Sequence, residues 1–185
     1  MFHRRRFAVA SVAGFLVGAT LLLVAGCGGS GSTPVGGGLL SKRQPAPNLS
    51  GTTLGGPQLD LGSLRGKVVV VNFYAQWCGP CRSEAGALRD AYTQTKASGV
   101  EFVGVLFQDS AVNGRAYLAS AGLTYPSLND SDGVMLTKFK NVNARTIPDT
   151  FVLDRQGKVA ARWIGPIKDE AQFVGVLNGL AAEPA

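Results

Sequence analysis

The chain has 185 residues, with 18 Lys and Arg against 12 Asp and Glu, and 45% of its residues are hydrophobic. Three of the basic residues stand at positions 4–6, so the remainder is close to neutral and carries no dense basic tract after residue 43. This pattern does not support nucleic-acid binding. The only histidine is His3, which excludes Ser-His-Asp and Cys-His catalytic groups from the rest of the chain.

The first 26 residues have the layout of a secretory signal, in which the three arginines precede the uncharged, mostly apolar stretch Ala8–Gly26. The stretch ends in small residues directly before Cys27, an arrangement that resembles a bacterial lipobox. We therefore predict a lipoprotein signal peptide over residues 1–26, with Cys27 lipidated and the protein anchored at the extracytoplasmic face of the cell membrane. An uncleaved transmembrane anchor and an ordinary cleaved signal stay open, because the apolar stretch is close to the ~20 residues that span a bilayer.

A flexible tether is predicted to follow, so that residues 27–45 comprise the lipidated cysteine and the tether. The reason is that Gly28–Gly38 contains only Gly, Ser, Thr, Pro and Val, which offer too few large apolar groups to order the segment. Residues 46–185 have the length of one ordinary domain, and they contain no internal repeat.

Within this domain, the apolar pattern predicts elements in the order β-α-β-α, then β-β-α. They are a short hairpin ending at 58–61, strands at 67–74, 100–107, 150–153 and 158–163, and helices at 78–96, 114–121, 134–140 and 169–182. The strand at 67–74 is a continuous apolar run, which is typical of a strand that is covered on both faces, and the strand at 100–107 is expected to be buried as well. Such an order indicates an α/β sheet with a parallel part and antiparallel strands at one side.

The segment Trp77–Cys81, which reads Trp-Cys-Gly-Pro-Cys, stands where the first long strand ends and the first helix begins. Two thiols at this spacing can close a disulfide, and the unpaired N–H groups of a helix start stabilise the thiolate that exchange requires. A purely structural disulfide would close too short a loop to stabilise the fold much. Zinc would need further Cys or His ligands, and haem attachment would need His in place of Arg82. The pair therefore predicts redox chemistry, with Cys78 as the exposed nucleophile and Cys81 as the buried resolving thiol.

Four segments resemble the membrane-anchored, thioredoxin-like proteins of the TlpA/ResA/DsbE group, and the resemblance extends over about residues 46–182. They are Leu64–Lys67, Asn72–Ala75, Trp77–Glu84 and Ile147–Asp154. The resemblance implies an α/β fold with a thioredoxin-like mixed sheet flanked by helices and an N-terminal hairpin. It also implies an insertion, with an extra helix and strand, between the second core strand and a proline-led strand, which residues 108–145 fit. At Ala85-Gly86 the chain lacks the helix-kinking proline that the group commonly has.

The same resemblance implies roles for polar residues near the cysteines. Glu84 lies three residues after Cys81, so both are expected on one face of the helix. In the group, a glutamate at this position takes part in proton handling, and Asn72 stands where thioredoxin itself has a buried Asp. The alternative for Glu84 is a solvated side chain that only favours the first helical turn through the helix dipole.

Substrate contacts are also implied by the resemblance. Pro148 is expected to form a cis peptide bond and to pack beside the disulfide, while the backbone of Ile147 pairs with the substrate. Trp77 is expected to flank the dithiol, with ordinary packing of an aromatic residue at a strand end as the alternative, and Gly79 and Pro80 complete the substrate-facing loop. The sequence Pro-Asp-Thr-Phe at 148–151 is close to the Pro-Glu-Thr-Phe of the DsbE branch, which favours a role in cytochrome c maturation.

The sequence thus predicts extracytoplasmic thiol–disulfide exchange, with no metal and no cofactor other than the redox-active disulfide. The Gly-Pro dipeptide between the cysteines matches thioredoxin, a reductant. It favours reduction of exported proteins such as apocytochrome c, with electrons from a membrane redox partner. Two alternatives stay open, namely an oxidase that introduces disulfides into exported proteins and a non-catalytic lipoprotein that only binds. The tight cysteine spacing argues against a peroxidase.

Overall fold

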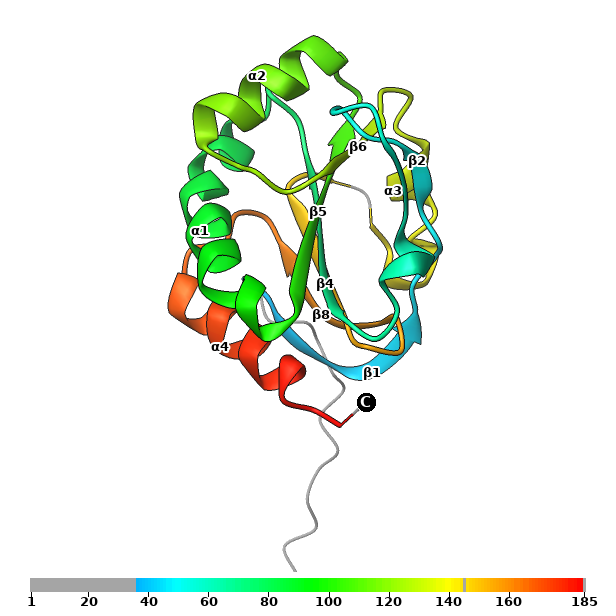
Figure 1. Ribbon diagram of the computed structural model, residues 1–185, viewed down its shortest axis with the longest axis vertical. Helices are drawn as coiled ribbons and strands as arrows, with labels where there is room; N and C mark the ends of the chain where they lie inside the picture. The colour runs from blue at the N-terminus through cyan, green and yellow to red at the C-terminus, as the bar shows by residue number, and fades with distance from the viewer. Residues whose placement is uncertain (1–35, 145, 185) are drawn as a thin grey trace, which may run out of the picture. The chain divides into compact units, whose positions relative to one another are not determined.

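The computed structural model describes residues 36–144 and 146–184 (Figure 1). The predicted signal peptide and the predicted lipidation site, Cys27, lie outside these residues. Over the part of the chain that the structure describes, no helix is both long and apolar enough to cross a bilayer.

A six-stranded sheet forms the centre of the fold, with the strand order β1-β8-β7-β4-β5-β6. Its strands are β1 (Gly38–Pro45), β4 (Val68–Tyr74), β5 (Val100–Phe107), β6 (Ser127–Asp130), β7 (Asp149–Leu153) and β8 (Lys158–Ile164). The β4–β5 and β5–β6 pairs are parallel, and the three pairs on the other side of β4 are antiparallel. A separate hairpin joins β2 (Ser50–Thr52) to β3 (Gln58–Asp60). This mixed sheet with an N-terminal hairpin confirms the predicted fold.

Helices cover the sheet on both faces, and β4 is buried along its whole length between them. The helices are α1 (Gly79–Thr95), α2 (Ala111–Ala121), α3 (Val134–Thr137) and α4 (Glu170–Ala181), with short 3₁₀ segments η1 (Leu61–Leu64), η2 (Lys96–Ser98) and η3 (Lys140–Val142). Figure 1 shows α1 and α4 together on one face, and α3 on the other. Alternate β4 side chains therefore enter two apolar clusters, and each buried Val or Phe contributes about 1.5–3 kcal/mol.

Two predicted helix boundaries are revised by the structure. Helix α2 begins at Ala111 rather than at 114, because the Ser110 hydroxyl accepts a hydrogen bond from the Asn113 backbone N–H at 3.1 Å and caps the helix. The helix predicted at 134–140 ends at Thr137 and is followed by η3. Helix α1 runs unbroken across Ala85-Gly86. The strand of the insertion is β6, which is too short for an apolar pattern to locate.

The predicted tether boundary at residue 45 is wrong. Residues 38–45 form β1, which pairs with β8 and is an edge strand of the main sheet. Leu40 packs against the apolar cluster on the α3 face, so the segment gains buried contacts that its Gly-rich start does not reveal. The folded domain therefore includes residues 38–45.

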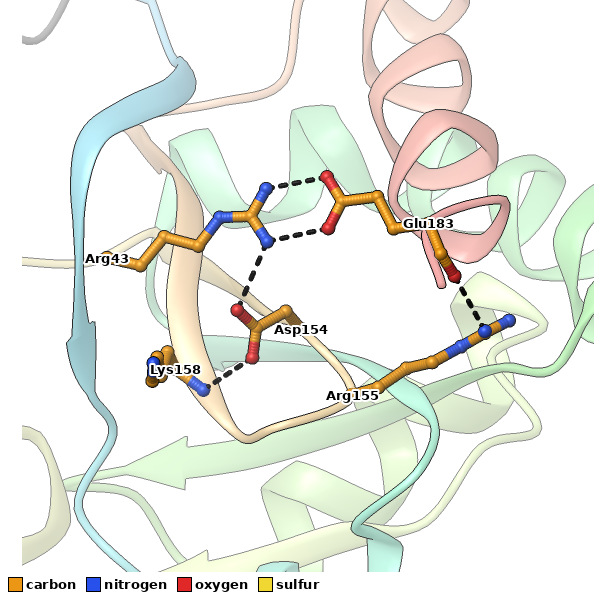
Figure 2. A network of polar contacts seen from close by, with 5 residues as sticks. All are labelled: Arg43, Asp154, Arg155, Lys158 and Glu183. Carbon is orange, nitrogen blue, oxygen red and sulfur yellow. Dashed lines mark hydrogen bonds and ion pairs between the residues drawn. The ribbon is translucent and has the colours of Figure 1, made fainter. Parts of the chain in front are cut away.

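A polar network ties β1 to the C-terminal end of the chain (Figure 2). The Arg43 guanidinium donates two hydrogen bonds to the Glu183 carboxylate, at 2.7 and 2.6 Å, and one to Asp154 at 3.2 Å. Asp154 also accepts the backbone N–H of Lys158, while Arg155 donates to the carbonyl of Glu183. The network thus joins the first strand, the β7–β8 turn and the end of α4.

Candidate active site

The disulfide Cys78–Cys81 is formed in the structure, with an S–S distance of 2.03 Å and a Cα–Cα distance of 5.3 Å. It lies where β4 ends and α1 begins, as predicted. Cys81 is fully buried, and Cys78 is only 4% exposed. The order of exposure agrees with the predicted roles, but Cys78 is not the exposed residue that the sequence predicts, because it belongs to the same buried apolar cluster as Ala75 and Cys81.

The start of α1 provides a donor to the sulfur of Cys78. Cys78 is the N-cap residue, and its Sγ accepts a hydrogen bond from the Cys81 backbone N–H at 3.2 Å. Pro80 occupies the first turn, where its missing N–H removes no helical hydrogen bond. Once the disulfide opens, the same N–H and the helix dipole stabilise a thiolate on Cys78.

Trp77 flanks the disulfide on the surface and is 55% exposed. Its indole Nε1 donates to the Gln108 carbonyl at 3.2 Å, and the neighbouring Gln76 N–H donates to Asp109 Oδ2 at 2.9 Å. We did not predict Gln108 and Asp109 from the sequence. A signal was present, because polar residues directly after β5 lie at the same edge of a parallel pair as the end of β4.

Glu84 is fully buried behind the cysteines, so the alternative of a solvated side chain is wrong. Its Oε1 accepts from Asn72 Nδ2 at 2.9 Å, and its Oε2 accepts from the Ile167 backbone N–H at 3.0 Å. Burial raises the pKa of Glu84 from 4.5 to about 7, and these two hydrogen bonds only partly oppose the effect. A carboxyl group that titrates near neutrality therefore lies one helical turn from Cys81.

Asn72 on β4 is hydrogen-bonded both to α1 and to β7. Its amide nitrogen donates to Glu84 and also to Thr150 Oγ1, each at 2.9 Å. Asn72 is 2% exposed and Thr150 is fully buried. The asparagine thus orients Glu84 as a neutral donor, and it adds no charge of its own.

The Ile147–Pro148 peptide bond is cis, as the resemblance implies. Pro148 is buried, and its carbonyl accepts the Gly165 N–H at 2.9 Å. Pro148 directly precedes β7, whose first residue Asp149 pairs with Phe73 near the end of β4. The register therefore brings Pro148 to the edge of the sheet that carries the disulfide, and Ile147 packs against the cluster that contains both cysteines.

Tyr117 is a further neighbour that the sequence did not reveal. Its hydroxyl donates to the Cys81 carbonyl at 2.9 Å across 36 positions of sequence. No local pattern marks it, because the contact depends on how α2 packs on α1.

A family model described as the AhpC/TSA family matches residues 43–162. The chain belongs to the AhpC/TSA family. The thiol-disulfide oxidoreductase ResA of Bacillus subtilis is 31% identical over 120 residues, which are 65% of this chain and 65% of that protein. The thiol:disulfide interchange protein HelX of Rhodobacter capsulatus is 32% identical over 132 residues, or 71% of this chain and 72% of its own length.

Solved structures that resemble this chain are also thiol–disulfide proteins. A thioredoxin-family thiol:disulfide interchange protein from Chlorobium tepidum superposes with a TM-score of 0.69 at 30% identity, covering 77% of this chain and 99% of that one. A secreted thiol-disulfide isomerase from Corynebacterium glutamicum has a TM-score of 0.73 at 29% identity, covering 80% and 92%. The predicted resemblance is confirmed, and the protein is a thioredoxin-fold thiol–disulfide oxidoreductase whose Cys-x-x-Cys pair is Cys78 and Cys81.

Proposed function

We propose that the protein reduces disulfides of exported proteins on the extracytoplasmic side of the membrane, using Cys78 and Cys81 and no further cofactor. The observation that carries this proposal is a closed disulfide at the N-terminus of α1 with a buried, near-neutral carboxyl group behind it. The Gly79-Pro80 dipeptide, which matches thioredoxin, supports the reducing direction.

The reaction begins with the dithiol form. The Cys78 thiolate attacks one sulfur of the substrate disulfide and forms a mixed disulfide, while the other substrate sulfur leaves as a thiolate that takes a proton. Cys81 then attacks Cys78 Sγ, which closes the internal disulfide and releases the second substrate thiolate. Two electrons pass to the substrate, and a membrane redox partner must return them.

Glu84 is the group proposed to accept the proton of Cys81 as this thiol becomes nucleophilic. It lies on the same helix face, and no histidine occurs among the residues after position 3. A base with a pKa of about 7 is half ionised at neutral pH, so it can take up a proton and release it again.

The substrate is proposed to lie over the exposed rim formed by Trp77, Gly79 and Pro80, all of which are exposed beside the nearly buried Cys78. The backbone of Ile147, next to the cis bond, would pair with the substrate chain. The Pro-Asp-Thr-Phe segment that begins at Pro148 supports apocytochrome c, or a similar exported thiol protein, as the substrate.

Anchoring through Cys27 is part of the same proposal. The N-terminal sequence pattern supports it. The relative from Corynebacterium glutamicum, which is described as secreted, supports export but not the lipid anchor. Mass spectrometry of the mature protein tests it. A diacylglycerol-modified Cys27 at the N-terminus is expected, and an unmodified Cys27 or an intact Met1 would contradict it.

Direction is tested by the reduction potential of the Cys78–Cys81 pair in glutathione buffers, together with trapping by a Cys81→Ser variant. We expect a potential near or below that of thioredoxin, about −270 mV, and mixed disulfides with few exported proteins. A potential near −120 mV, the value of the strong oxidant DsbA, with capture of many exported proteins would contradict reduction.

One observation favours the oxidase as the second candidate. The Cys81 N–H that bonds Cys78 Sγ stabilises the reduced thiolate, and stabilisation of the reduced form makes a disulfide more oxidising. Reduction of insulin by the dithiol form separates both functions from a non-catalytic binding lipoprotein, which would show no turnover.

A further inference from the structure

The hydrogen bond from Tyr117 to Cys81 ends on the backbone of the resolving cysteine. Tyr117 belongs to α2 and is 4% exposed, and its hydroxyl donates to the Cys81 carbonyl at 2.9 Å. A carbonyl in the first turn of a helix accepts from the N–H four residues later, and its second lone pair is free for another donor. The tyrosine is therefore not needed to satisfy this carbonyl. Its effect is to fix where the carbonyl lies.

Tyr117 is itself held in place from the other side. Its ring stacks on Tyr74, with ring centroids 4.8 Å apart and planes inclined by 25°. The Tyr74 hydroxyl shares a 2.9 Å hydrogen bond with Ser127 on β6. Gly104 leaves room for this arrangement, because a Cβ there would lie 2.9 Å from the Tyr74 ring and 3.0 Å from Ser127 Oγ. A buried chain of contacts thus runs from β6 through two rings to Cys81.

The hydroxyl of Tyr117 remains a donor at any pH at which exchange is measured. Burial raises the pKa of this phenol above its usual value of 10, and the nearby Glu84 carboxylate raises it further. Ionisation of Glu84 during the reaction therefore does not remove the bond to Cys81.

We propose that Tyr117 is a positioning residue of the exchange site. Its hydroxyl holds the first turn of α1 in the geometry in which Cys81 Sγ reaches Cys78 Sγ, and so it favours the closed disulfide over the dithiol. The proposal rests on exchange at these two cysteines, but it does not depend on the direction of electron flow. It assigns to α2 and β6, which belong to the insertion, a role in setting the potential of the site.

The step that Tyr117 assists is the closing one. The Cys81 thiolate forms a bond to Cys78 Sγ, the bond between Cys78 and the substrate sulfur breaks, and that sulfur leaves with the electron pair and takes a proton from water. The two cysteines lose two electrons, and the substrate gains them. The equilibrium constant of this intramolecular step reflects the effective concentration of the Cys81 thiol at Cys78. This effective concentration falls when Cys81 is less well positioned.

The test compares Tyr117→Phe with Tyr125→Phe in the full chain. Both variants remove one buried phenol hydroxyl and keep the ring, but the hydroxyl of Tyr125 has no hydrogen-bond partner among the described residues. The equilibrium constant for oxidation by glutathione is measured for each protein, together with the rate at which the mixed disulfide with glutathione resolves.

We expect the constant for Tyr117→Phe to fall about fivefold, the size of one ordinary hydrogen bond. This corresponds to a potential about 20 mV more positive. Resolution of the mixed disulfide should slow by a similar factor, and Tyr125→Phe should stay within about twofold of the parent on both measures. A Tyr117→Phe variant within twofold of the parent, or equal shifts in both variants, would overturn the proposal.

If Tyr117→Phe does not fold, Ser127→Ala provides the second test, because it releases Tyr74 and its stacked partner without touching α1. A smaller shift in the same direction is expected, and no shift would contradict the proposal. The parent protein's potential tests the reducing direction, whereas the difference between variant and parent tests Tyr117. The two proposals can therefore fail independently.

Discussion

Glu84 and Asp149 are both fully buried carboxyl groups beside the active-site end of β4, but within the part of the chain that the structure describes only Asp149 forms a salt bridge with a basic side chain. Asp149 accepts two hydrogen bonds from the Arg162 guanidinium, at 2.8 and 2.6 Å. Among the described residues, Glu84 accepts only from the Asn72 amide and the Ile167 backbone N–H. The guanidinium opposes the rise in pKa that burial gives Asp149, whereas Glu84 has no such compensation and titrates near pH 7.

The difference in hydrogen-bond donors distinguishes Asp149, whose charge has a structural role, from Glu84, whose carboxyl group is suited to proton transfer. A buried carboxylate with a bidentate arginine is held in one protonation state and one position. A buried carboxyl group with only neutral donors exchanges its proton near neutral pH. The Asp149–Arg162 pair links β7 to β8 directly after Pro148, whereas Glu84 lies one helical turn from Cys81. The following predictions test this contrast.

The largest effect is expected from Arg162→Met. The substitution leaves the Asp149 carboxylate buried without its cation and also removes the bond from Arg162 to the Val142 carbonyl. Loss of one partner of a buried pair typically costs about 3–5 kcal/mol, so the free energy of unfolding at pH 7 should fall by that amount. Urea unfolding of the disulfide form measures it. The double variant Arg162→Met/Asp149→Asn should recover part of the loss, and no recovery would show that the charge is not the cause.

The second prediction concerns the pH dependence of the unfolding free energy. The folded-state pKa of Glu84, about 7, lies above its ordinary value of 4.5. Between these values the unfolded chain loses the proton and the folded one keeps it, so the stability contributed below pH 4.5 is lost as the pH rises toward 7. A shift of this size corresponds to about 3 kcal/mol. We expect the unfolding free energy of the parent, relative to Glu84→Gln, to fall by that amount between pH 4.5 and 8. A constant difference would refute the raised pKa.

A third prediction addresses the rate. Glu84→Gln should slow exchange at pH 7 by about tenfold or more and remove an inflection near that pH, because the variant cannot carry a proton. Glutathione exchange measured from pH 5 to 9 provides the profile. Glu101→Gln, at a half-exposed residue paired with Lys67, is the matched control and should leave the profile unchanged. An unaltered profile in Glu84→Gln would reject its role in proton transfer.

The sequence revealed those parts of the site that depend on local order. One short stretch of sequence contains the apolar run of β4, the two cysteines at the following helix start and Glu84 three residues later. The geometry of this stretch follows from one strand and one helix. The spacing does not predict that Glu84 is buried, because this depends on a distant segment. The backbone N–H that donates to Glu84 belongs to Ile167, 83 positions away.

The parts that the sequence did not reveal depend on packing between distant segments. Tyr117 reaches Cys81 only because α2 lies against α1, and nothing in its neighbours distinguishes it from an ordinary core tyrosine. Strand β1 was mistaken for a tether because its composition is poor in apolar residues. The strand is ordered because it pairs with the edge of β8 and because Arg43 bonds to Asp154 in the β7–β8 turn and to Glu183 after α4.

The smallest effect is expected from Arg43→Ala in the network that ties β1 to the C-terminal end. The side chains of Arg43 and Glu183 are 31% and 39% exposed, so solvent and salt screen their attraction, and such pairs contribute about 0–1 kcal/mol. Asp154 keeps the Lys158 N–H after the change, so its carboxylate is not left without a donor. The unfolding free energy should therefore fall by no more than about 1 kcal/mol, and the fall should shrink in 1 M salt. A loss as large as that of Arg162→Met would mean that the bidentate geometry, and not burial, decides the strength of an arginine–carboxylate pair in this fold.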